Sequence, residues 1–132
     1  MFKKVFLIFL IIFSVVSFAD DNVQPVFTDN KNPIKVSQGQ TFAITLQSNA
    51  TTGYSWKWDA TTFDQNLVTL VSHKYIAPQN KKMVGAPGYE VWTFKAKPAD
   101  YRVMQMGHIV MEYQRPWEKT PGTTKTFVVH VK

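Results

Sequence analysis

The chain has 132 residues, no cysteine and a formal net charge of +6 at neutral pH. This length indicates one small domain with a single core, and the lack of cysteine excludes a scaffold held together by disulfides. The lysines and arginines are scattered rather than gathered in a basic stripe. They therefore indicate a solvated surface and no nucleic-acid partner.

Residues 1–19 have the features of a secretory signal peptide. A short basic start precedes a long apolar run, and small residues at Ser17 and Ala19 fit a signal-peptidase site. The run is shorter than the roughly 20 residues of a membrane span, so an uncleaved anchor is the alternative. We expect cleavage after Ala19 and export, periplasmic or secreted, with no membrane association afterwards. The mature chain would keep 13 basic and 9 acidic residues, a net charge of +4.

A polar stretch at residues 20–32 is expected to be a flexible N-terminal arm. The hydrophobic pattern after it has a period of two rather than a helical repeat, and only residues 99–104 leave room for a helical turn. These features predict an all-β, immunoglobulin-like antiparallel β-sandwich of about seven to eight strands over residues 33–132. The expected strands lie at 34–36, 40–47, 54–58, 67–76, 89–96, 106–113 and 124–131.

Alternate strands of such a sandwich run in the same direction. The loops at 48–53, 77–88 and 114–123 should therefore gather at one pole. Their sequences contain more than turn residues, because two threonines stand beside Tyr54 and a tryptophan, Trp117, follows Arg-Pro. Trp, Tyr and Arg dominate binding hot spots, which indicates a binding surface. The alternative for Trp117 is a lid folded back over the end of the sandwich.

The three loops resemble those of the chagasin family, protein inhibitors of papain-like cysteine peptidases with an immunoglobulin-like fold. The family's loops read N-P-T-T-G-[YF], G-x-G-G and R-P-W. This chain has N-A-T-T-G-Y at 49–54, G-A-P-G at 85–88 and R-P-W at 115–117, in the same order. It departs from the pattern at Ala50, where the family usually has proline, and at Pro87, which replaces the first glycine of the pair.

The resemblance implies reversible occlusion of the peptidase cleft by a monomer, with no cofactor and no metal. The first loop would enter the cleft with Thr51 near the catalytic cysteine and histidine, while Tyr54 anchors the loop base. The middle loop would lie flat against one wall, and Trp117 would stack on the leaving-group side. The residues implied to bind the peptidase are Asn49, Thr51, Thr52, Gly53, Tyr54, Gly85, Gly88, Arg115, Pro116 and Trp117.

An enzyme is not expected, because the sequence has no Ser-His-Asp motif and no metal-ligand pair. The histidines at 73, 108 and 130 are interpreted as surface or sheet residues, and Glu118 as a support of the third loop. The rival hypothesis is an extracytoplasmic β-sandwich that binds carbohydrate or protein. A sugar platform would need several aromatic rings exposed on one sheet face, whereas strand position predicts that Trp56 and Trp92 belong to the core.

Overall fold

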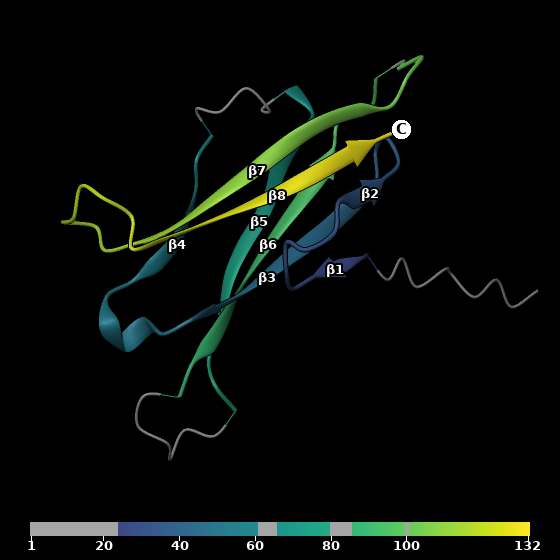
Figure 1. Cartoon of the computed structure of the whole chain (residues 1–132). Coiled ribbons are helices and arrows are strands. Elements are labelled where there is room, and N and C mark those ends of the chain that lie inside the picture. Colours follow the sequence, from purple (N-terminus) through teal and green to yellow (C-terminus); the bar gives the residue numbers. More distant parts are fainter. Residues whose placement is uncertain (1–23, 61–65, 80–85, 100) are drawn as a thin grey trace, which may run out of the picture.

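The protein is described by a computed structural model over residues 24–60, 66–79, 86–99 and 101–132. Two four-stranded sheets pack face to face, with strand orders β1-β3-β6-β5 and β2-β8-β7-β4 (Figure 1). This confirms the all-β sandwich. The strands are β1 (Val26–Phe27), β2 (Ile34–Val36), β3 (Thr41–Ser48), β4 (Ser55–Trp58), β5 (Val68–Ile76), β6 (Gly88–Ala96), β7 (Gln105–Gln114) and β8 (Thr123–Val131).

The long strands pair antiparallel, as the sequence predicts, and two short edge strands pair parallel: β1 on β3 and β2 on β8. Strand β1 lies inside the stretch expected to be a flexible arm. Its two residues pair with Ala43 and Ile44, and the amide of Ala43 donates to the Pro25 carbonyl at 2.9 Å. A two-residue strand is too short to leave an alternation in the sequence. Residues 101–104 contain no helical turn.

Inward-facing side chains of the two sheets form one core. Phe42, Phe94 and Phe127 are fully buried, and the rings of Phe42 and Phe94 stack with centroids 5.9 Å apart. Each buried ring of this kind stabilises the fold by about 1.5–3 kcal/mol. Trp56 and Trp92 are also buried, so the prediction that they belong to the core is confirmed.

The expected gathering of three loops at one pole follows from the strand register. β3 and β5 flank β6 and end beside its first residues, where Ser48 pairs with Gly88 and Ile76 pairs with Tyr89. β7 ends at Gln114, which pairs with the first residue of β4. The described residues 49–54, 77–79, 86–87 and 115–122 form this end, which we call the loop pole; it runs along the left and lower edge of Figure 1.

The expected signal peptide at residues 1–19 and the site residue Gly85 lie outside the described residues. Among the residues that the structure does describe, no helix is long and apolar enough to cross a membrane.

Candidate functional site

Residues 49–54 form a compact turn, the wedge loop, built around one turn of 3-10 helix, η1 (Ala50–Thr52). Asn49 caps it: its Oδ1 accepts from the Thr51 amide at 3.2 Å and from the Thr51 hydroxyl at 2.6 Å. The Thr52 hydroxyl donates to the Asn49 carbonyl at 2.7 Å. These bonds fix the turn from within. Ala50 stands where the family usually has proline, and the turn is held here by the polar contacts of Asn49, Thr51 and Thr52.

Gly53 closes the turn with φ of 79°, in the left-handed region that favours glycine. A methyl group added to it would lie 2.9 Å from Cη2 of Trp117. Trp117 is 70% exposed, yet its ring tip rests on this glycine. The ring is thus packed against the wedge loop and does not cover the core. It presents a large, oriented aromatic surface to solvent.

Arg115 joins the third loop to the wedge loop. Its Nε donates to the Thr52 carbonyl at 3.1 Å, and its Nη1 lies 3.2 Å from Oε1 of Glu118. The guanidinium carbon also lies 4.5 Å from the Tyr54 ring centroid and 5.8 Å from that of Trp117. Arg115 thus pairs with Glu118 of its own loop and braces the wedge loop. Pro116 beside it is exposed.

A stack of three rings supports the wedge loop from below. Tyr113, near the end of β7, lies between Tyr54 and Trp56, with centroid distances of 5.1 and 4.9 Å. Its hydroxyl accepts from the Asn49 amide at 2.9 Å. Tyr54 therefore anchors the loop base, as expected. The sequence motifs do not include Tyr113, although its place directly before the third loop is a usable signal.

The buried carboxylate of Glu90 lies beneath the base of the wedge loop. Glu90 of β6 is 2% exposed; its Oε2 accepts from the Trp56 amide at 3.0 Å, and its Oε1 lies 2.7 Å from Nε2 of His73. The His73 ring stacks on Trp92 at a centroid distance of 4.0 Å. Glu90 thus ties β6 to β5 within its sheet and to β4 in the other sheet. The sequence motifs did not predict this role, although the alternation of Glu90 with Trp92 and Phe94 places it inward.

The middle loop differs at its base. Gly88 is buried at the start of β6, and a methyl group added there would lie 2.3 Å from the Ile76 carbonyl oxygen and 2.5 Å from the Tyr75 hydroxyl. Only glycine permits this approach to β5. Pro87 before it is exposed. Gly88 supports the loop from inside the sheet, and its predicted contact with a peptidase remains a prediction.

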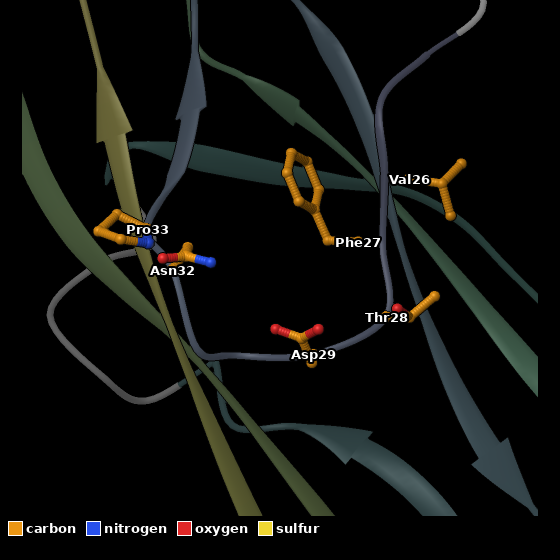
Figure 2. A pocket seen from close by; sticks show the side chains of 6 residues that line it. All are labelled: Val26, Phe27, Thr28, Asp29, Asn32 and Pro33. Atoms are coloured by element: carbon orange, nitrogen blue, oxygen red, sulfur yellow. The ribbon is translucent and has the colours of Figure 1, made fainter.

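Two cavities lie away from the loop pole. One, of about 270 Å³, is lined by residues between Val26 and Pro33, and Figure 2 shows the Phe27 ring turned into it while Val26 points away. The other, of about 330 Å³, lies beside Trp58 and Lys97. No group of three or more metal-ligating side chains occurs among the described residues. The features that stand out chemically are therefore the protruding loops.

Comparison with known proteins gives a consistent set of matches. Residues 35–131 match the family described as chagasin family peptidase inhibitor I42. Chagasin of Trypanosoma cruzi is 29% identical over 105 residues, which cover 78% of this chain and 90% of chagasin.

Solved structures agree on the fold. A cysteine protease inhibitor from Entamoeba histolytica superposes with a TM-score of 0.63 at 23% identity, covering 82% of this chain and 95% of that one. The solution structure of Amebosin gives a TM-score of 0.58 at 26% identity, covering 83% of this chain and 96% of Amebosin. The sandwich fold is thus shared with these proteins.

Proposed function

This chain belongs to the chagasin family of peptidase inhibitors, and from that premise we propose that it inhibits papain-like cysteine peptidases reversibly, as a monomer, by filling the active-site cleft with the loop pole. The family is one of inhibitors and not of enzymes. The Entamoeba histolytica protein of the same fold is itself a cysteine protease inhibitor. The observation that carries the proposal is the internally bonded wedge loop with Trp117 packed against its glycine.

The chemistry of the wedge loop suits a cleft that holds a cysteine and a histidine. The Thr51 hydroxyl donates a hydrogen bond to Oδ1 of Asn49, which leaves its oxygen lone pairs to act as acceptors. A histidine N–H in the enzyme is the matching donor. Gly53 lets the backbone approach closely, and no covalent step is needed.

The wedge loop is also a poor substrate. Peptidases bind their substrates extended, in the manner of an added strand. Residues 49–53 instead form a turn, in which Oδ1 of Asn49 accepts from the Thr51 amide and the Gly53 amide donates to the Ala50 carbonyl at 3.3 Å. Extension would break these bonds. The inhibitor should therefore survive contact with the active enzyme.

A carbohydrate-binding module is not favoured. Trp56 and Trp92 are buried, Trp58 is partly buried, and Trp117 is the exposed tryptophan within the described residues. The exposed rings of Tyr75 and Tyr89 project from opposite faces of their sheet and Trp117 lies at the pole, so among the described residues no sheet face presents a platform of exposed rings.

The direct test is a titration of the purified protein against papain and a cathepsin with a fluorogenic substrate. We expect reversible inhibition that persists after long incubation, with the chain recovered intact. Serine peptidases and metallopeptidases serve as controls and should be unaffected. Inhibition that disappears as the chain is digested would show a competing substrate instead.

We further propose that residues 1–19 direct export and are removed, which the basic start, the apolar run and Ala19 support. Mass spectrometry of the protein recovered outside the cytoplasm should find an N-terminus at Asp20. An intact N-terminus in the membrane fraction would indicate the uncleaved anchor.

A further inference from the structure

Three apolar side chains are exposed where β5 and β6 meet the loop pole. Tyr75, Ile76 and Tyr89 are 43%, 44% and 47% exposed. Ile76 and Tyr89 are register partners and project from the same face of the sheet, whereas Tyr75 projects from the other face with its hydroxyl close to Gly88. Together they cover both faces of the β5–β6 pair at the end that meets the loop pole. We call these three residues the stem patch.

The stem patch adjoins the wedge loop. Tyr89 pairs with Gln47, which lies two residues before Asn49, so a row of cross-strand neighbours runs from Ile76 through Tyr89 to the wedge-loop base. The wedge loop connects β3 of one sheet to β4 of the other. The ends of β5 and β6, which carry the stem patch, and the loop between β7 and β8, which carries Trp117, therefore lie on opposite sides of the wedge loop (Figure 1).

We infer that the stem patch is a fourth contact surface for the peptidase, packed against apolar side chains on the cleft wall opposite the one that Trp117 contacts. This rests on the proposed function. A cleft filled by the wedge loop has a wall on each side, and the stem patch is continuous with the surface that faces one of them. Exposed tyrosines beside an apolar side chain have the composition of an interface core.

The presence of Pro87 in the middle loop favours a peptidase contact made by apolar side chains at the stem. A proline has no backbone N–H, so the middle loop offers one hydrogen-bond donor fewer than the double-glycine motif would. Contact by apolar side chains at the stem does not need that donor. The stem patch would then set which peptidases are inhibited well, favouring those with an apolar wall.

The opposite pole supplies a matched control. Val103 and Met104 are 69% and 51% exposed in the connection between β6 and β7, at the far end of the sandwich. They match the stem patch in apolar character and exposure, but they lie away from the wedge loop. If exposed apolar side chains strengthened inhibition regardless of their position, substitution of Val103 or Met104 would weaken inhibition as much as substitution in the stem patch.

The test compares Ile76→Thr and Tyr89→Thr with Val103→Thr, because threonine keeps the β-propensity of the two strand positions, Ile76 and Tyr89. Inhibition constants and dissociation rates are measured against papain, with melting curves on every variant. We expect each stem variant to weaken inhibition by about tenfold, mainly through faster dissociation, and Val103→Thr to match wild type. Unchanged inhibition by both stem variants, with wild type still inhibiting, would overturn the stem patch alone.

Hydroxyl-radical footprinting of the wild-type complex keeps the test decisive if a variant folds poorly. Tyr89 should be protected by the peptidase and Met104 should not. Equal labelling of Tyr89 with and without peptidase would overturn the inference. Failure of wild type to inhibit at all would instead remove the proposed function, and the stem patch with it.

Discussion

The wedge loop and the base of the middle loop lie at the same pole but hold their shapes by different means. The wedge loop is fixed by short polar contacts, chiefly those from Asn49 and Arg115. The middle-loop base is fixed by close packing, because Gly88 lies against the Ile76 carbonyl and the Tyr75 hydroxyl. Polar contacts fix one geometry and fail when one atom is lost. The wedge loop should therefore be the more sensitive of the two to small changes.

The largest expected effect comes from Glu90→Ala. This change removes the buried carboxylate that lies beneath the wedge loop and two residues after Gly88. It leaves the buried Trp56 amide and the His73 ring nitrogen without their partner. An unsatisfied buried donor and a lost side-chain hydrogen bond together cost about 3 kcal/mol. For a domain of this size we expect the melting temperature to fall by more than about 10 °C, measured by calorimetry. A loss under about 2 °C would show that Glu90 does not support the pole.

Gly53→Ala should have the next largest effect. Together with its control, it separates the effect of backbone strain from the effect of a lost contact. The left-handed φ of 79° and the contact with Trp117 both oppose a side chain here. We expect inhibition to weaken by about a hundredfold as the wedge loop and Trp117 shift apart.

Gly39→Ala is the matched control, because Gly39 has φ of 75° but nothing within 4 Å of an added methyl group, and it lies at the far pole. It should lose a similar amount of stability, about 1–3 kcal/mol, and inhibit like wild type. Equal loss of inhibition by both variants would mean that strain alone explains the effect.

Trp117→Ala should weaken inhibition by about thirtyfold, on the order of 2 kcal/mol, since an exposed ring at an interface centre acts as an anchor. The melting temperature should barely change, because the ring is 70% exposed. A large drop in melting temperature with unchanged inhibition would make Trp117 a structural lid.

The smallest effect expected is that of Tyr113→Phe, which removes one hydroxyl and keeps the ring stack. The Asn49 amide loses its acceptor, a change of about 1 kcal/mol. Inhibition should weaken by about fivefold, measured beside Tyr101→Phe at the opposite pole, which should leave inhibition unchanged. No difference between the two variants would show that the wedge loop keeps its shape without Tyr113.

The strands were predictable because each long strand carries a period-two pattern of its own. Phe42, Ile44 and Leu46 alternate, and so do Trp92, Phe94 and Ala96, and the structure buries all six. The shared pole followed from strand direction alone. No such pattern marks the two-residue β1 or the parallel pairing of the edge strands. A segment of two or three residues is too short to indicate which strand it pairs with.

The chemistry of the site was predictable only residue by residue. The motifs identified Thr51, Gly53 and Trp117, but not that Trp117 lies on Gly53 or that Asn49 caps the turn. The contact of Glu90 with the Trp56 amide crosses from one sheet to the other. A hydrophobic pattern predicts which face a side chain occupies, but not what it meets across the core.

The central claim is that a preformed loop pole fills the cleft without covalent chemistry. Binding of the protein to papain whose catalytic cysteine carries a small blocking group, measured by calorimetry beside active papain, tests this most directly. The account predicts a complex with blocked papain that is weaker than with active papain but clearly formed, and equal recovery of intact inhibitor from both. A complete requirement for the free thiol, or a thioester trapped with the active enzyme, would contradict it.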